Sequence, residues 1–425
     1  MNVYVDSIGC RLNQSEIEKI ASQFRVAGHT IVQSAAEADL VVVNTCAVTS
    51  AAASDSRQKL RHAVRAGAET VIATGCWATL EPEAAAKLTG VSMVVPNQAK
   101  GQLVSDLLSI PQEVFDYEPL AREPLPGTHL RTRAFIKVQD GCDNHCTFCI
   151  TRVARGAGAS QSLEDVLMDI QHAVMGGARE VVLSGVHLGS WGQDWGGRTR
   201  LRDLIAAILN DTDVERLRLS SLEPWDLDEN FFRLWENPRM CRHLHLPLQS
   251  GSAATLKRMV RNTTPPEYRQ IISMARHAAE DMAITTDIIV GFPGEDDEEF
   301  AESRAFIEEM QFSGGHVFTY SVRPGTPAEK LKPRIPTAIA RVRNHQVQAI
   351  LKDSGDRYRQ SQLGKTVSVL WESASARDAS GWRIHGLTDT YIKVQTYADQ
   401  PLWNELSQVR LTGSMEDGLT GEIAV

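Results

Sequence analysis

The stretch QDGCDNHCTFCI, residues 139–150, guides the interpretation of the whole chain because it places three cysteines within eight residues. They are Cys142, Cys146 and Cys149. The motif CxxxCxxC directly follows an apolar segment typical of a β-strand, so three thiolates on one loop can surround a metal centre. A structural zinc site uses four ligands, whereas an iron–sulfur cluster held by three cysteines leaves one iron open. The spacing favours the cluster, and a Cys3His zinc site that uses His145 is the alternative.

An alternation of strand-like and helix-like segments begins at Arg133, just before this motif. Six β/α units over about 190 residues predict a (β/α)6 partial TIM barrel rather than a Rossmann sheet. The expected strands are Ala134–Gln139, Glu180–Ser184, Arg216–Ser220, His243–Leu246, Ile284–Val290 and His316–Tyr320.

The N-terminal region also alternates, and its apolar strands predict a parallel α/β sheet that is covered by helices on both faces. The expected strands are Val3–Ser7, Asp39–Asn44, Thr70–Thr74 and Val91–Pro96. Cys10, Cys46 and Cys76 each follow one of these strands at a similar offset. Because parallel strands end at one edge of a sheet, the three loops can converge into a second three-cysteine site. Three independent buried cysteines are the alternative.

Two changes in the pattern of residue types along the chain indicate domain boundaries. The segment Val114–Leu130 contains several prolines and little periodicity, which predicts a linker. From about Gln362, short strand patterns separated by turn residues predict a small antiparallel β-barrel. The sequence therefore predicts an α/β protein of three domains, with boundaries at 1–127, 128–361 and 362–425.

The composition is that of an ordinary globular protein. The 425 residues are 42% hydrophobic and 23% charged, which excludes collagen-like and disordered classes. The longest apolar run is far below the ~20 residues that a spanning helix needs, and the N-terminus lacks signal-peptide features. We therefore expect a cytoplasmic protein without a membrane partner. Seven cysteines, an odd number, indicate ligand or catalytic roles, although Cys241 has no partner motif and is interpreted as a core residue.

Together these features carry a resemblance to a known family. The CxxxCxxC motif resembles the radical S-adenosylmethionine (SAM) superfamily. Its combination with three N-terminal cysteines and a C-terminal barrel similar to a TRAM domain resembles the methylthiotransferases, over essentially the whole chain. The segments GVHLGSWG (Gly185–Gly192), SSLEPWDLD (Ser220–Asp228) and HLHLPLQSGS (His243–Ser252) look most like the branch that modifies N6-threonylcarbamoyladenosine in tRNA.

The resemblance implies two [4Fe–4S] clusters. Cys142, Cys146 and Cys149 would hold a cluster that binds and reductively cleaves SAM, and these three residues would be catalytic. Cys10, Cys46 and Cys76 would hold a second cluster, whose open iron carries the sulfur to be donated. Methylthiolation would occur at C2 of the modified adenosine at position 37, in the tRNA anticodon stem–loop. Gly185, His187, Glu223 and Gln249 are expected to contact SAM because they follow the barrel strands. A reducing electron donor is also implied, while the sulfur source is unknown.

The chain departs from the family pattern at four positions. After Cys149, Arg152 stands where a proline is usual, and Ala157 and Ala159 stand where basic residues are common. This puts in doubt any cofactor or RNA contact made from Ala159. Thr79 replaces a frequent glutamine after Cys76.

The formal net charge of -9 is an average over basic and acidic stretches. From Arg323 to Gln362 there are nine Lys or Arg against three Asp or Glu, which favours an RNA-facing surface. Two other functions remain open: the same chemistry on a ribosomal-protein aspartate, and a zinc-stabilised RNA-binding protein without catalysis.

Overall fold

The computed structural model describes residues 1–117, 132–378 and 381–424, so most of the expected linker Val114–Leu130 lies outside the described residues. The chain divides into two compact units. The first contains Met1–Asn144, Ile150–Gly177 and Ser184–Val186, and the second contains His145–Cys149, Ala178–Leu183 and His187–Val425.

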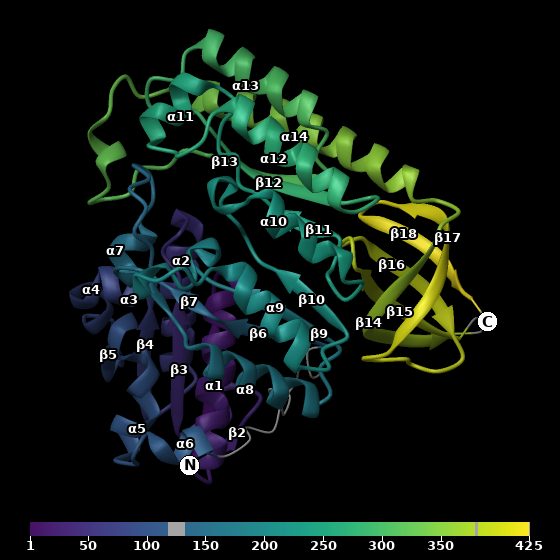
Figure 1. Ribbon diagram of the computed structural model, residues 1–425. Helices are drawn as coiled ribbons and strands as arrows, with labels where there is room; N and C mark the ends of the chain where they lie inside the picture. Colours follow the sequence, from purple (N-terminus) through teal and green to yellow (C-terminus); the bar gives the residue numbers. More distant parts are fainter. Residues whose placement is uncertain (118–131, 379–380, 425) are drawn as a thin grey trace. The chain divides into compact units, whose positions relative to one another are not determined.

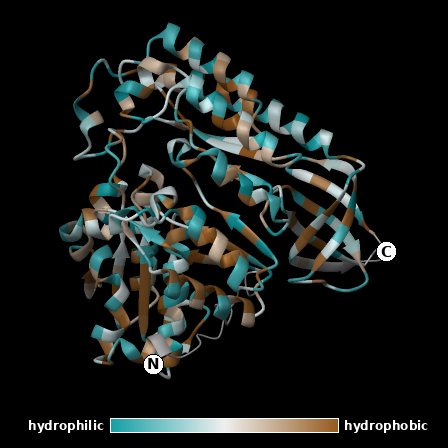
Figure 2. Ribbon diagram, viewed as in Figure 1, coloured by the Kyte–Doolittle hydropathy of each residue, from teal (hydrophilic) through white to brown (hydrophobic). Residues whose placement is uncertain are grey.

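A five-stranded parallel sheet forms the centre of the first unit, in the order β2-β1-β3-β4-β5 (Figure 1). Its middle strand β3 is buried along its whole length, as expected for a sheet covered on both faces. The hydropathy colouring of Figure 2 shows this strand as a hydrophobic stripe. The strands are β1 (Asn2–Ser7), β2 (Thr30–Ile31), β3 (Leu40–Thr45), β4 (Thr70–Gly75) and β5 (Met93–Val95).

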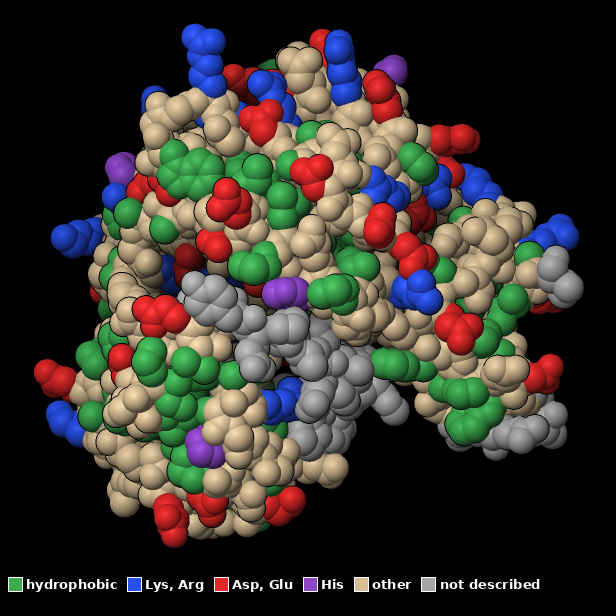
Figure 3. Space-filling model, turned by 60° about the horizontal axis from the view of Figure 1, so that its bottom comes forward, with side chains coloured by type: hydrophobic (Ala, Val, Ile, Leu, Met, Phe, Trp, Pro, Cys, Tyr) green, Lys and Arg blue, Asp and Glu red, His purple; other side chains and the backbone are tan. Residues whose placement is uncertain are grey.

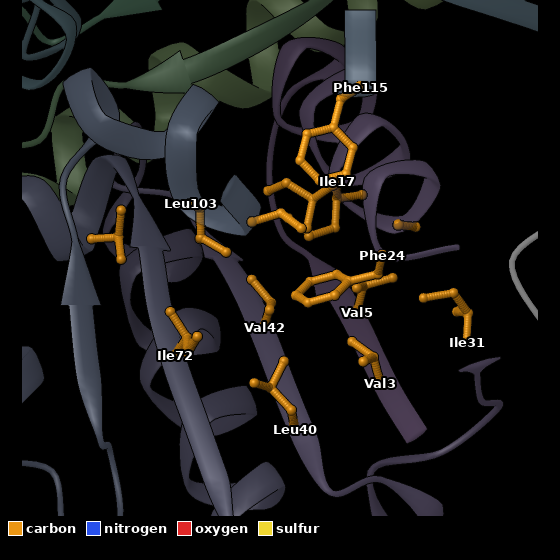
Figure 4. Packing of buried hydrophobic residues seen from close by; sticks show 14 residues of the cluster. Val3, Val5, Ile17, Phe24, Ile31, Leu40, Val42, Ile72, Leu103 and Phe115 are labelled. Carbon is orange, nitrogen blue, oxygen red and sulfur yellow. The ribbon is translucent and has the colours of Figure 1, made fainter. Parts of the chain in front are cut away.

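Helices cover both faces of this sheet, which confirms the predicted architecture. On one face, α1 (Arg11–Val26), α5 (Leu103–Leu108) and α6 (Glu113–Tyr117) pack on the sheet, and Figure 4 shows Ile17 and Phe24 beside Val5 and Val42. The other face carries α2 (Ser50–Arg65), α3 (Cys76–Leu80) and α4 (Pro82–Ala86), with the fully buried Trp77 in its core. The unit also contains β6 (Arg133–Lys137), β7 (Gln139–Asp140), α7 (Thr151–Arg155), β8 (Ala159–Ser160) and α8 (Leu163–Met175).

All six predicted central strands are present. They form two three-stranded sheets, in the orders β10-β9-β6 and β11-β12-β13, and their described pairings are parallel. Isolated bridges join the β10 segment to the β11 segment, at Leu217–Met240 and Ser221–His245. The strands are β6, β9 (Glu180–Ser184), β10 (Arg216–Leu219), β11 (His243–His245), β12 (Ala283–Val290) and β13 (Gly314–Thr319).

Helices pack on one face of the sheet β11-β12-β13 (Figure 1). Burial alternates along β12, so that Ile284, Ile288 and Val290 are buried, whereas Thr285 and Asp287 on the opposite face are partly exposed. The helices of this unit are α9 (Leu201–Asp211), α10 (Glu229–Phe232), α11 (Ala253–Met259), α12 (Pro265–Ala278), α13 (Asp297–Met310) and α14 (Thr337–Ser361).

The C-terminal region forms a closed barrel in the order β14-β15-β16-β18-β17, as predicted. Most of its pairings are antiparallel, but the pairing between β16 and β18 is parallel. The strands are β14 (Thr366–Asp378), β15 (Gly381–Thr388), β16 (Lys393–Ala398), β17 (Leu406–Met415) and β18 (Gly418–Ile423).

One loop of this barrel packs against the beginnings of the central strands. The Arg218 guanidinium donates to the carbonyl oxygens of Thr388 and Asp389, at 3.1 and 2.8 Å, and forms an ion pair with Glu180. Arg242 forms an ion pair with Asp389 at 2.7 Å. The small barrel is therefore joined to the end of the central strands that lies opposite their C-terminal loops. Within the described residues, no helix is long and apolar enough to cross a membrane.

Candidate functional site

The CxxxCxxC loop begins directly after β7, and its three cysteines are partly exposed. Glycine is required at its start, because a Cβ on Gly141 would lie 1.8 Å from the carbonyl oxygen of Ala157. The Cys142 amide donates to the carbonyl of Gly156 at 3.1 Å, and the Cys149 amide donates to that of Cys146 at 3.1 Å. The backbone of the loop is therefore held at both ends of the motif.

Arg261 is a site residue that the sequence analysis missed. Its side chain is 2% exposed, and its Nη1 lies 3.7 Å from the Cys146 sulfur. Burial raises the pKa of the Cys146 thiol, and the positive charge of Arg261 opposes that shift. A buried cation beside a cysteine stabilises the thiolate that a metal requires. No local motif surrounds Arg261 in the sequence, so only the tertiary contact identifies it.

Two expected SAM contacts lie in the surroundings of Arg261. Glu223 forms a bidentate pair with it, at 3.1 and 2.5 Å, and the guanidinium lies 4.5 Å from the centre of the Trp225 ring. His187 lies near the same tryptophan, 6.4 Å from Trp225 between ring centres, and its Nε2 is 2.6 Å from Asp226. The structure thus places His187 against the loop after β10, which carries Glu223.

The other two expected contacts are placed differently. Gln249 has a left-handed backbone, with φ of 69°, and forms a bridge with Ile288 in β12. Gly185 directly follows β9 and is partly exposed. Contact with SAM remains a prediction for these four residues.

The dispersed cysteines meet at one edge of the N-terminal sheet. The register aligns Ser7 of β1 with Asn44 of β3, and Asn44 with Thr74 of β4, so the three strands end at the same level. Cys10, Cys46 and Cys76 follow these residues by two or three positions. The expected convergence of the three loops is therefore present, although their role as ligands remains a prediction.

Close contacts hold these thiols. A Cβ on Gly9 would lie 2.6 Å from the Cys46 sulfur, so glycine at that position leaves space for the thiol. The Asn97 amide donates to Cys76 at 3.6 Å, and the Cys10 thiol donates to the Asn13 carbonyl oxygen at 3.8 Å. Thr79, one of the departures from the family pattern, accepts a hydrogen bond from the Asn97 backbone at 2.9 Å. Thr79 therefore helps to place the amide that reaches Cys76.

A buried network of charged side chains lies close to the three thiols. Glu16 accepts hydrogen bonds from Lys100 at 2.6 Å and from Arg155 at 2.9 Å, and all three side chains are at most 6% exposed. Burial alone would raise the pKa of Glu16, but its cationic neighbours hold the pKa well below its usual range. Arg155 also bonds Asn13 at 2.7 Å and Asp140 at 2.9 Å. The network therefore fixes a positive charge near the thiols.

The donor set of this sheet edge suits an iron–sulfur cluster. Burial raises the pKa of Cys46 to about 11 and also raises that of Cys10, with Arg155 acting in the opposite direction on both. Binding of a metal would shift these thiols to thiolates. No three His, Cys, Asp or Glu side chains of the described chain lie close enough to hold a single metal ion. In a four-iron cluster, by contrast, each thiolate binds a different iron.

Cys241 has the buried environment expected of a core residue. It is 2% exposed, and burial raises its pKa to about 11. Its sulfur lies 3.9 Å from Glu180, within the polar contacts that join the small barrel to the central strands.

Three other residues depart from the family pattern, and they lie on the segment that follows the CxxxCxxC loop and pairs with its start. Ala159 in β8 pairs with Asp140 in β7, and Ala157 packs against Gly141. Arg152 lies in α7, which is held by the hydrogen bond from Asn97 to the Ala154 carbonyl oxygen.

The basic stretch from Arg323 to Gln362 is partly neutralised by its own surroundings. Arg343 is buried and pairs with Glu295, while Arg357 pairs with Asp353 in the same helix. On the face drawn in Figure 3, the described acidic and basic side chains are interspersed without a large patch of one sign. An RNA-facing surface on this stretch remains a prediction.

Comparison with known proteins gives two family matches. Residues 2–96 match the family described as uncharacterized protein family UPF0004, and residues 136–307 match the radical SAM superfamily. Among solved structures, the radical SAM methyltransferase TsrM from Kitasatospora setae is similar, with a TM-score of 0.59 and 14% identity. That match covers 77% of this chain and 75% of TsrM, and it shows a shared fold.

Sequence relatives cover nearly the whole chain. Threonylcarbamoyladenosine tRNA methylthiotransferase MtaB of Bacillus subtilis is 33% identical over 95% of this chain and 92% of its own length. The tRNA-2-methylthio-N(6)-dimethylallyladenosine synthase of Geobacter metallireducens is 32% identical over 100% of this chain and 98% of its own length. With both family domains and both three-cysteine sets present, the chain belongs to the methylthiotransferase family of the radical SAM superfamily.

Proposed function

We propose that this protein methylthiolates C2 of N6-threonylcarbamoyladenosine at position 37 of tRNA. The observation that carries the proposal is the presence of two separate three-cysteine sets on one chain, because each set leaves a cluster iron open. The similarity to MtaB supports the choice of substrate.

The chain offers a distinct set of residues for each bound group. Cys142, Cys146 and Cys149 would hold the cluster that binds SAM, and Arg261 provides a buried positive charge beside Cys146. The sheet edge with Cys10, Cys46 and Cys76 would hold the second cluster. When bound, these groups supply one-electron cleavage of SAM and the sulfur for transfer. The protein orients the groups and limits the access of water.

We propose that the three predicted domains divide these roles. Residues 1–127 would carry the second cluster, residues 128–361 the SAM site, and residues 362–425 the TRAM-like barrel. The tRNA anticodon stem–loop would be the partner, with a reducing electron donor, and the reaction would take place in the cytoplasm.

Nucleoside mass spectrometry of tRNA from a deletion strain tests the substrate. We expect loss of 2-methylthio-N6-threonylcarbamoyladenosine and its recovery when the wild-type chain is restored. An unchanged nucleoside would contradict the assignment. A change in the mass of a ribosomal protein instead would favour the aspartate substrate.

Anaerobic reconstitution tests the two clusters. We expect about eight irons per chain, falling to about four in Cys46→Ala and in Cys146→Ala. Only Cys146→Ala should lose SAM cleavage, whereas Cys46→Ala should keep cleavage and lose sulfur insertion. Cys241→Ala is the matched control, because this cysteine lies in the core, and it should retain about eight irons. One zinc and no iron in the wild-type protein would support the RNA-binding alternative.

A further inference from the structure

Among the described residues, helices pack on one face of the sheet β11-β12-β13 and not on the other, although the interior of a complete barrel is normally a packed core. Three strands place ionisable or aromatic side chains on this face, among them Asp287, His316 and Phe318. The His316 side chain is 75% exposed and Phe318 is 40% exposed. Both side chains are therefore accessible to a ligand on this face of the sheet.

A carboxylate organises two imidazoles on this face. Asp287 lies 3.3 Å from His316 Nδ1 through one oxygen and 3.3 Å from His245 Nε2 through the other. Burial would raise the pKa of Asp287, but hydrogen bonds from the two histidines hold it well below its usual range. An ionised carboxylate only accepts hydrogen bonds. The two nitrogens that face Asp287, which are Nδ1 of His316 and Nε2 of His245, must therefore carry protons. This fixes the orientation of His316 and directs its Nε2 edge away from Asp287.

The same strand leads from this group to the CxxxCxxC loop. Tyr320 packs with Ile289 and Phe292 in a cluster that includes Phe148, which lies between Cys146 and Cys149. The Tyr320 hydroxyl is buried and has no hydrogen-bond partner among the described residues. His316 precedes Tyr320 by four residues, or about 13 Å of strand. A purine beside the loop could therefore extend a polar substituent toward His316.

We propose that His316, oriented by Asp287, binds the carboxylate of the threonylcarbamoyl group and so determines substrate specificity. This inference rests on the proposed function. The dimethylallyl group of the other tRNA substrate class carries no charge. An imidazole that donates from both nitrogens, from Nδ1 to Asp287 and from Nε2 to the ligand carboxylate, can therefore discriminate between the two. Phe318, whose ring centre is 6.2 Å from that of His316, supplies an apolar surface for the adjoining part of the nucleoside.

Binding of anticodon stem–loop RNAs tests the inference directly. The probes carry N6-threonylcarbamoyladenosine or its methyl ester, which removes the negative charge and keeps the remaining substituent. The wild-type protein should bind the free acid about tenfold more tightly than the ester, equivalent to about 1.4 kcal/mol. In His316→Gln this ratio should fall to about one, because the amide cannot carry a positive charge. Asp287→Asn should also reduce the ratio.

His277→Gln is the matched control, because His277 is exposed on helix α12 and should leave the ratio unchanged. Thermal unfolding distinguishes ligand recognition from a structural role. A His316→Gln protein with a lower melting temperature and an unchanged ratio would show that the residue only supports the sheet, and would overturn the inference.

Measuring product formation distinguishes a failure of the specificity inference from a failure of the proposed function. If the wild-type protein modifies the threonylcarbamoyl substrate but binds acid and ester equally, the specificity inference fails and the proposed function stands. If the wild-type protein forms no 2-methylthio product on this substrate, both fail.

Discussion

Replacing Glu16 by alanine should lower the free energy of unfolding of the first unit by about 3–5 kcal/mol, because it leaves buried cations without their carboxylate. Lys100 is 5% exposed and, among the described residues, would keep only the side-chain oxygen of Asn44 as an acceptor, at 3.1 Å. Arg155 is affected less, since it also pairs with Asp140. The loss is a large part of the 5–15 kcal/mol that stabilises a typical domain.

Native-state hydrogen exchange of the full chain measures this change at the amides of β3. Since 1.4 kcal/mol is a factor of ten, exchange through global opening should accelerate by about a hundredfold or more. The double variant Glu16→Leu/Lys100→Met removes the buried cation together with its carboxylate, and should recover much of the loss. A single-variant effect below about 1 kcal/mol, or a double variant no more stable than Glu16→Ala, would refute the reasoning.

Three further predictions follow from the same contacts. Because the pKa of Glu16 is lowered in the folded state, the stability difference between wild type and Glu16→Gln should be complete above pH 4.5 and shrink in acid titrations below it. Gly9→Ala should displace Cys46 and reduce reconstituted iron from about eight to about four, whereas Gly28→Ala, also at positive φ but without neighbours within 4 Å, should retain it. Arg218→Met should weaken the attachment of the small barrel and accelerate its release in limited proteolysis, while the exposed Arg410→Met should not.

Local patterns were sufficient to predict most of the fold. Apolar runs between helix-like segments indicated the strands of the N-terminal sheet and of the central domain, because these strands are buried against neighbouring elements. An antiparallel barrel was predicted, and the parallel pairing of β16 with β18 differs from that prediction. Pairing partners depend on how the barrel closes, and periodicity carries no information about that.

The candidate site was likewise predicted from the sequence only in part. The sequence by itself determined the two cysteine sets, since thiolate chemistry depends on residue type and on position after a strand. Only the tertiary structure placed Arg261 beside Cys146 and Glu16 beside Arg155, residues 139 positions apart in the chain. It also paired Asp287 with His316 across neighbouring strands. Charge pairing in a buried or half-buried site depends on the distance between side chains in space. Residues far apart in the sequence come within that distance only when the sheets have formed and packed.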